Sequence, residues 1–496
     1  MFSNLMQGLM SVFSNPMVFL LMIFGVVSGI TIGALPGLTS TMAMAVLLPV
    51  TFGMEAKMSF ALLLSVYCGA IYGGSITAIL INTPGTPSAA ATTFDGYALA
   101  KRGQAGKALA TSTLSSSIGG IISVLLLTTI APILAKFTLR FAAPEFFALA
   151  VFGLSIIASI SNKNIVKGLM AGFFGLIIAS IGLDPISAIP RFTFGRTELL
   201  SGVAFIPLMV GLFALPQCFV EMESMFKEKT ILKGVHSKLI NFKEFLSILP
   251  TIIKSALMGA FIGAVPGAGG DIAAFTAYNE AKRNAKKNEN FGTGELKGIA
   301  APEAANNAST GGAMIPLLSL AVPGDSNTAV LLGGLIIMGL QPGPLLFTQQ
   351  SDIVNSIFAI MLLANVFMGI IGLAGIRFFV KALSVPKQII VPVVLTLSVV
   401  GSYSMNNSIF DVFVTIVFGI IGYVMLKADV IVSPIVLAVI LGPMAETNYR
   451  RALIMFDGNY SFLYNRPITV VFLSLAIFTI VSSLFKQKLF KRGVSR

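Results

Sequence analysis

Residues 83–90 read "TPGTPSAA" and interrupt a long apolar stretch of the chain with two prolines and a glycine. Proline cannot continue the helix before it, and glycine allows the chain to turn. Thr86 then has the place of an N-cap, with Pro87 at the first helical position, where proline is favoured. The stretch therefore predicts a helix, a break at Pro84 and Gly85, and a new helix that begins inside the apolar region.

A second copy of this break lies in the other half of the chain, where Pro323 and Gly324 interrupt the helix and Asp325 takes the N-cap place. Similar segments occur in the same order in both halves, which predicts an internal repeat. The matched segments are "GALPG" (33–37) with "GAVPG" (263–267), "YGGSITAIL" (72–80) with "TGGAMIPLL" (310–318), and "TPGTPSAA" with "VPGDSNTA" (322–329).

The composition predicts an all-α polytopic membrane protein. Of 496 residues, 55% are hydrophobic and only 11% are charged. Segments such as "MVFLLMIFGVVSGITIGA" (17–34) approach the roughly 20 residues that cross a bilayer as a helix. No strand-like alternation is present, so helices rather than a barrel are expected to span the membrane.

Composition also excludes several functions. The net charge of +13 is typical of cations at cytoplasmic helix ends rather than of nucleic-acid binding. The single histidine, His236, cannot build a His-based metal site or triad, and the two cysteines form no disulfide framework. Redox and hydrolytic enzymes are therefore disfavoured. The sequence has no G-x-x-x-x-G-K-[ST] phosphate loop, which argues against transport driven by ATP hydrolysis.

The polar stretch at 221–244 divides the chain into a first membrane half (1–225), a basic cytoplasmic linker (226–247) and a second membrane half (248–496). The first 54 residues carry no charge, whereas the linker is rich in lysine. This asymmetry places the N-terminus outside and the linker in the cytoplasm. Matched helices would then enter from opposite faces, as in the inverted repeats of secondary transporters, whose discontinuous helices or hairpins meet near the midplane.

Helix breaks at membrane depth predict a binding site. A buried helix start has free N–H groups and about half a positive charge, and an anion satisfies both. The competing interpretation is that proline and glycine only kink these helices. Four breaks at repeat-related positions favour a binding site. The substrate-binding candidates are Pro36, Gly37, Thr39, Ser40, Asn82, Thr83, Pro84, Gly85, Thr86, Ser88, Pro266, Gly267, Pro323, Gly324, Ser326 and Asn327.

Together with "GALPG", the segments "YGGSITAILINTPGTPSAAATTFDGYALAKRGQAGKALA" (72–110), "APEAANNASTGGAMIPLL" (301–318) and "VPGDSNTAVLLGGL" (322–335) resemble the large membrane subunit of the tripartite tricarboxylate transporters. The resemblance extends from about Gly33 to the C-terminal spans. It implies a multi-pass carrier of carboxylates in the bacterial inner membrane, without a cofactor. The implied partners are a small four-helix membrane subunit and a periplasmic solute-binding protein, and the implied drive is a sodium or proton gradient.

Acidic residues inside the membrane are costly, which marks Asp271, Glu303 and Asp325 in the second repeat. The first repeat has neutral residues at the corresponding places, namely Thr41, Ser65 and Thr86. One interpretation is that the second repeat binds the coupling ion while the neutral first repeat binds the substrate anion. The alternative is that Asp325 is a plain N-cap and that Glu303, after Pro302, lies in a first helical turn. The full set of coupling-ion candidates is Asp271, Glu303, Asn306, Asn307 and Asp325.

The sequence thus predicts a secondary transporter that imports a small di- or tricarboxylate by alternating access, of which an elevator-like motion is one form. Two other classes stay open. A channel for small anions would need pore-lining rings, against which the discontinuous helices argue. A membrane-embedded enzyme would need a nucleophile, a base and an orienting group, and no such spacing is visible.

Overall fold

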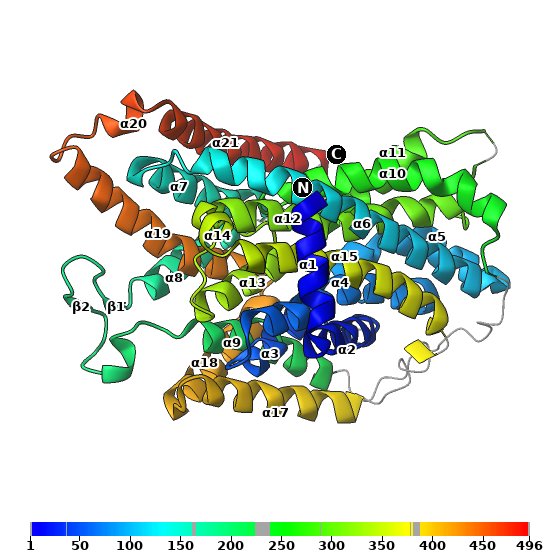
Figure 1. The fold of residues 1–496 in the computed structure, drawn as a ribbon, viewed down its shortest axis with the longest axis horizontal. Helices are drawn as coiled ribbons and strands as arrows, with labels where there is room; N and C mark the ends of the chain where they lie inside the picture. The colour runs from blue at the N-terminus through cyan, green and yellow to red at the C-terminus, as the bar shows by residue number, and fades with distance from the viewer. Residues whose placement is uncertain are drawn as a thin grey trace. The chain divides into compact units, whose positions relative to one another are not determined.

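The computed structural model describes residues 2–35, 37–160, 165–223, 239–287, 289–376, 378–379 and 387–494. Almost all regular structure in these residues is helical, as Figure 1 shows. Nine of the described helical segments are long and apolar enough to cross a membrane. The chain is therefore an all-α polytopic membrane protein, which confirms the predicted class. Pro36, His236 and most of the predicted linker lie outside the described residues.

The chain folds as two compact units that each combine two stretches of sequence. Unit 1 contains Met1–Ala135 and Gln217–Gly401, and unit 2 contains Lys136–Pro216 and Ser402–Arg496. These units cut across the predicted halves 1–225 and 248–496, because the matched segments of both halves fold together in unit 1. Three helices run from one unit into the other, namely α6 (Ala105–Thr138), α9 (Phe205–Glu223) and α17 (Lys387–Asn406).

The first repeat of unit 1 begins after the N-terminal helix α1. Asn15 caps the start of α2, where its side chain accepts a hydrogen bond of 3.1 Å from the amide of Met17. The helix then breaks before α3, and the long α4 breaks again before the short turn η2. The elements before α6 are α1 (Phe2–Ser14), α2 (Pro16–Gly33), α3 (Ser40–Leu47), η1 (Pro49–Thr51), α4 (Ala56–Ile81), η2 (Pro87–Ala90), α5 (Thr92–Leu99) and η3 (Ala100–Gln104).

The second repeat of unit 1 has the same order of elements. Asn241 and Glu244 form a capping box, with each side chain accepting from the other residue's backbone amide at 2.8 and 3.0 Å, and start the first helix at Phe242. The elements are α10 (Phe242–Ala264), α11 (Gly269–Arg283), α12 (Leu296–Leu320), α13 (Ser326–Ile337), α14 (Pro344–Gln349) and α15 (Ser351–Ala374).

Matched glycines let the two long helices of each repeat pack closely. A Cβ atom added to Gly73 of α4 would lie 3.0 Å from the amide nitrogen of Ala34, at the end of α2. Gly312 of α12 takes the same place, one residue later than the pairing of 72–80 with 310–318 predicts, because its added Cβ would lie 3.0 Å from the amide nitrogen of Ala264, at the end of α10. Such close approach of small residues is typical of helix pairs in membranes. The hairpins α2–α4 and α10–α12 are therefore built in the same way.

Each hairpin also packs against the last long helix of the other repeat. Helix α15 contacts α2 and α4 of the first repeat. Helix α6 contacts α12 at Gly119, whose added Cβ would lie 2.8 Å from the Cα of Ala304. Ile122 and Leu126 of α6 pack on the small buried residues of α10 and α12. This exchange of helices joins the two repeats into one unit.

Unit 2 contains α7 (Ala143–Ile160), α8 (Ile165–Ala179), η4 (Thr197–Leu199), α18 (Ile409–Lys427), α19 (Ser433–Met455), α20 (Phe462–Asn465) and α21 (Pro467–Val494). Its short strands β1 (Gly182–Leu183) and β2 (Pro190–Arg191) pair antiparallel. The carboxylate of Asp184 follows β1 and accepts hydrogen bonds from Arg191 and, at 2.9 Å, from Arg450 of α19. The ion pair with Arg450 fixes the loop after α8 to α19 within unit 2.

Candidate functional site

Four helix starts that follow chain breaks gather in unit 1. The start of α3 meets the start of α13, where the hydroxyl of Thr41 donates to Asn327 Oδ1 at 3.0 Å. The start of α11 meets η2, since a Cβ added to Gly270 would lie 3.4 Å from the Cβ of Ser88. Asp271 of α11 is also close enough to Asp325 to interact with it electrostatically. The breaks of both repeats therefore form one cluster, although they are far apart in the sequence.

One side of this cluster is closed by hydrogen bonds between the repeats. Tyr67 of α4 is fully buried, and its hydroxyl donates to Asp325 Oδ2 at 2.7 Å. The other carboxylate oxygen of Asp325 accepts from the amide of Thr328 at 2.8 Å and completes a capping box. Asp325 is therefore the N-cap of α13. The contact between Thr41 and Asn327 lies on this same side.

The other side of the cluster, called the open side below, is the one on which buried polar atoms lack hydrogen-bond partners among the described residues. It holds the residues that correspond by repeat to the closed side: Asn306 lies six residues before Gly312, as Tyr67 lies six before Gly73. The side chain of Asn306 is 0% exposed, and neither its oxygen nor its nitrogen has a hydrogen-bond partner among the described residues. A Cβ added to Gly270 at the start of α11 would lie 2.7 Å from Asn306 Oδ1 and 3.0 Å from Ser309 Oγ.

An orphaned buried amide is costly, because both its donor and its acceptor have lost water without gaining a partner. Asn306 lies beside the start of the 15-residue helix α11, where free backbone N–H groups and the helix dipole favour an anion. The open side therefore has hydrogen-bond donors of the kind that a carboxylate needs.

The second break of each repeat reverses the chain before its proline and glycine, not at the glycine as the sequence predicts. In both second breaks the reversal is made by the last residue before the x-Pro-Gly segment, since Asn82 has a φ of 53° and Ala321 a φ of 58°. The backbone of Gly85 does not enter the left-handed region, so the prediction that Gly85 makes the turn is wrong. Gly85 is instead required by space, because an added Cβ would collide with the carbonyl oxygen of Gly33 and lie 2.8 Å from the Cα of Gly74.

The glycines of the two first breaks do turn the chain, with a φ of 92° at Gly37 and 79° at Gly267. Thr39 caps α3, and its hydroxyl accepts from the amide of Met42 at 3.1 Å. Gly267 donates its amide to the carbonyl oxygen of Gly324 at 2.7 Å, which ties the two breaks of the second repeat together.

The remaining candidates lie at the same breaks. Thr86 and Ser88 are buried at the start of η2, where their hydroxyls are 3.2 Å apart, and Thr86 makes no capping hydrogen bond. The Thr83 hydroxyl donates locally to the carbonyl of Ile81. Pro84, Pro266 and Pro323 stand within the breaks, and Ser40 and Ser326 are the first residues of α3 and α13.

Glu303 corrects one expectation. It lies about two turns into α12, which begins at Leu296, so it is not in a first helical turn. The matched glycines Gly73 and Gly312 also show that its counterpart is Leu64 rather than Ser65, because each lies nine residues before its glycine. The Glu303 carboxylate is fully buried and accepts four hydroxyl hydrogen bonds.

Asn307 faces away from the breaks toward a second polar cluster. Its side-chain amide donates to the carbonyl of Cys68 at 3.3 Å, and Asn365 of α15 reaches the thiol of the same cysteine. The structure therefore separates the two neighbouring asparagines, with Asn306 at the cluster of breaks and Asn307 at the packing of α4, α12 and α15.

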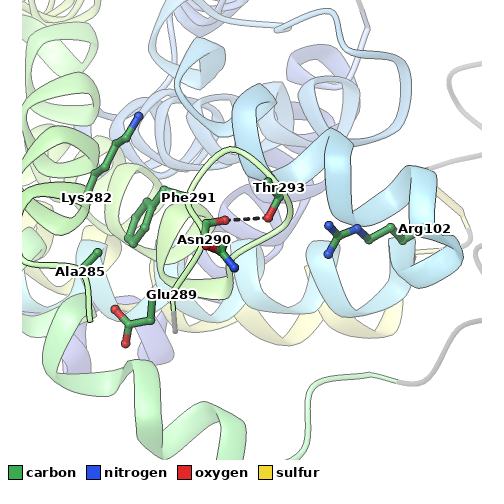
Figure 2. A pocket seen from close by; sticks show the side chains of 7 residues that line it. All are labelled: Arg102, Lys282, Ala285, Glu289, Asn290, Phe291 and Thr293. Carbon is green, nitrogen blue, oxygen red and sulfur yellow. Dashed lines mark hydrogen bonds between the residues drawn. The ribbon is translucent and has the colours of Figure 1, made fainter. Parts of the chain in front are cut away.

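A separate surface pocket of about 490 Å³ lies between η3, the end of α11 and the loop that follows it (Figure 2). Arg102, Lys282, Asn290 and Thr293 supply its polar groups. Partial burial raises the pKa of Glu289 in this pocket, but the hydrogen bonds and charges of Lys297 and Lys286 together outweigh burial and hold that pKa below its ordinary value. None of the predicted site residues lines this pocket.

Sequence reasoning missed several residues that hold the site. Tyr67 corresponds to Asn306 only once the structure pairs Gly73 with Gly312, because the sequence match of 72–80 with 310–318 pairs Asn306 with Cys68. Ser112 and Ser116 are four residues apart, a spacing that places both on one face of a helix. Asp95 of α5 is 0% exposed and accepts from the backbone amides of 292, 294 and 295, each at 2.8 Å. No local pattern predicts that contact, because it joins α5 to the loop before α12.

Comparison with known proteins agrees with the early resemblance. Residues 19–437 match the family described as "Tripartite tricarboxylate transporter TctA family". An uncharacterised 52.8 kDa protein in the TAR-I ttuC' 3' region of Agrobacterium vitis is 36% identical over 468 residues, or 94% of this chain and 93% of that protein. An uncharacterised protein in the TAR-II ttuC' 3' region of the same organism is 35% identical over 234 residues, or 47% of this chain and 97% of that protein. No solved structure matches the chain.

Proposed function

The chain belongs to the tripartite tricarboxylate transporter TctA family, and we propose that it is the permease through which a small di- or tricarboxylate enters a bacterial cell across the inner membrane. Tripartite systems of this family combine a large membrane subunit with a small membrane subunit and a periplasmic binding protein. We infer that this chain works with two such partners and that the binding protein delivers its substrate.

The observation that carries the proposal is the orphaned amide of Asn306 beside the start of α11 and close to Ser88. A carboxylate bound there would accept from the Asn306 side chain, from the free amides of the helix start and from the Ser88 hydroxyl. Hydrogen bonds to a charged group contribute roughly 1.5–3 kcal/mol each, which repays the desolvation of the anion. The site would therefore recognise the carboxylate group shared by the whole substrate class.

The arrangement favours a carrier that alternates its access. The closed side of the cluster is joined by hydrogen bonds between the repeats, at Tyr67 with Asp325 and at Thr41 with Asn327, whereas the Asn306 amide on the open side has no partner among the described residues. Two matched sides in different states are what a carrier needs if opening one side accompanies closure of the other. We also propose that the two repeats are inserted with opposite orientations and that an ion gradient drives uptake.

Uptake into proteoliposomes tests the function. The full chain is reconstituted with its small membrane subunit and binding protein, and labelled citrate, tartrate, succinate and malate are offered under imposed sodium or proton gradients. Saturable, gradient-driven accumulation of one of these compounds supports the proposal. Flux that rises linearly with concentration and never accumulates substrate indicates a channel, and a chemically altered product indicates an enzyme.

Orientation has its own test. Single cysteines placed before Met17 and at position 237 are labelled with an impermeant reagent in intact cells. The inverted arrangement requires the first to react from outside and the second only after lysis. Reaction of both from the same side rules it out, although carboxylate transport could still stand.

A further inference from the structure

The carboxylate of Glu303 occupies a shell made only of hydroxyl groups. Ser75 of α4 donates to Oε1 at 2.6 Å, and Thr92 of α5 donates to the same oxygen. Ser112 and Ser116 of α6 donate to Oε2 at 3.1 and 2.9 Å. Glu303 itself and all four donors are buried to 0% exposure. Three helical elements of the first repeat thus converge on one acid of the second.

Within the described part of the chain, no cationic side chain balances this acid. Among the described residues, no lysine or arginine forms an ion pair with Glu303. The nearest lysine of α6, Lys107, is paired with Glu244 of α10 at 2.7 Å. Tyr72 of α4 interacts with Glu303 electrostatically, but its hydroxyl forms its hydrogen bond with the hydroxyl of Thr113, at 2.7 Å. Asp95 of α5 is occupied by backbone amides and by Tyr278 of α11.

Two opposing effects act on such a group. Removal from water favours the neutral acid, whereas four hydroxyl donors favour the charged carboxylate. Hydroxyls can serve both forms, because each one also accepts a hydrogen bond. When the acid gains a proton, a serine in a helix can turn its own hydrogen to a carbonyl one turn earlier and accept from the acid. A lysine or arginine partner could not adapt in this way.

The shell suits a proton better than a metal ion. Its hydroxyl oxygens lie directly against the carboxylate oxygens, at hydrogen-bond distances of 2.6 to 3.1 Å, so the packed groups leave no gap between them for an ion. A proton requires no additional volume. The matched position of the first repeat is Leu64, so the group is present once.

We propose that Glu303 carries the coupling proton of this transporter, with Ser75, Thr92, Ser112 and Ser116 as the shell that stabilises its charged form. One proton from the aqueous phase forms an O–H bond on a carboxylate oxygen and leaves to the opposite side after the conformational change. The role of Glu303 in coupling rests on the proposed transport function, whereas its protonation can be tested independently of transport.

Infrared difference spectroscopy tests the protonation without any substrate. The purified full chain is titrated with acid and base, and the C=O stretch of a protonated carboxyl group in an apolar environment is followed. We expect this band in the wild type and in Asp95→Asn, which removes an equally buried but fully satisfied carboxylate. We expect it to be absent from Glu303→Gln. A band that persists unchanged in Glu303→Gln overturns the proposal.

Transport then tests the coupling. In the reconstituted system, [14C]citrate and [14C]tartrate are measured both as accumulation under an inward proton gradient and as counterflow against unlabelled substrate. A gradient of one pH unit can supply up to about tenfold accumulation for each coupled proton. We expect Glu303→Gln to lose this accumulation and keep counterflow within about twofold of the wild type, because glutamine fills the shell but exchanges no proton.

Accumulation that survives in Glu303→Gln, or a wild type driven only by sodium, overturns the inference and leaves the transport function standing. Absence of counterflow for every carboxylate in the wild type instead contradicts the transport function. Should Glu303→Gln fail to fold, the double variant Ser112→Ala and Ser116→Ala keeps the acid and removes two donors. Its infrared band should titrate over a different pH range, and an unchanged titration overturns the proposal.

Discussion

The second breaks of the two repeats share a backbone but differ in the side chains that complete them. At both breaks, the residue before the x-Pro-Gly segment lies in the left-handed region, and the glycine packs against the end of the first long helix of its own repeat, α2 or α10. Gly85 lies against Gly33. A Cβ atom added to Gly324 would lie 3.0 Å from the carbonyl oxygen of Gly263. Steric demands of the chain path are therefore the same in both copies.

The side chains diverge where the new helix begins. In the second repeat, Asp325 caps the 12-residue helix α13 and also binds Tyr67. In the first repeat, Thr86 makes no capping bond and is followed by the short turn η2. The break at Pro323 and Gly324 thus has its polar groups paired within the protein, whereas the break at Pro84 and Gly85 lies beside the orphaned Asn306. The backbone is therefore the same at both breaks, and the polar side chains decide which copy has donors left for a ligand.

The largest effect is expected where the two breaks agree. Gly85→Val and Gly324→Val should both abolish carboxylate uptake, because an added Cβ alone would already lie 2.8 Å from the Cα of Gly74 or 2.7 Å from the Cα of Ala313. Gly334→Ala in α13 is the control, since its Cβ would meet only flexible leucine side chains, Leu48 at 3.2 Å and Leu63 at 3.7 Å. Uptake and the amount of protein in the membrane are measured together. Normal uptake by either valine variant would show that the close approach is dispensable.

The next effect separates the open side from the closed side. Asn306→Leu keeps the branched shape and the number of side-chain heavy atoms but removes both orphaned polar atoms, so we expect unchanged or higher thermal stability. The loss of a hydrogen bond to a charged substrate should weaken the apparent affinity at least about tenfold.

Tyr67→Phe is the matched control, because it removes the hydroxyl that donates to Asp325 at the corresponding place. Leaving one acceptor of Asp325 without its partner should lower stability by about 1–3 kcal/mol, with a smaller effect on substrate affinity. Thermal denaturation in detergent and uptake kinetics measure the two quantities. Equal phenotypes in both variants would contradict the division into an open and a closed side.

The difference between these sides could be predicted only in part. Proline and glycine act through local backbone geometry, so the breaks, the helix starts at Pro87 and Asp325, and the repeat itself are visible in the sequence. The hydroxyl shell of Glu303 is not, because Ser75, Thr92 and the serines of α6 come together only through tertiary packing. The same holds for Asp325, whose sequence context indicates a cap but not its contact with Tyr67.

A smaller effect should distinguish the two N-cap positions. Thr86→Val keeps the shape and removes the hydroxyl, so it should leave stability unchanged and raise the apparent Michaelis constant by about tenfold if that hydroxyl contacts the charged substrate. Asp325→Ala should instead cost about 0.5–2 kcal/mol of stability through loss of the cap. Calorimetry and uptake kinetics are compared for both. A destabilised Thr86→Val with normal kinetics would assign Thr86 a structural role like that of Asp325.

The smallest effect concerns the residues that reverse the chain. Asparagine tolerates the left-handed region, whereas alanine there carries a strain of roughly 1–2 kcal/mol. Asn82 is therefore suited to its φ of 53°, and Ala321 is strained at its φ of 58°. Glycine removes the strain but loses more chain entropy on folding, so Ala321→Gly should stabilise the protein by about 0.5–1 kcal/mol. The matched Asn82→Gly should gain less, because its strain is smaller. Thermal denaturation of both variants checks the order, and an Ala321→Gly variant less stable than the wild type would show that the left-handed alanine carries no such strain.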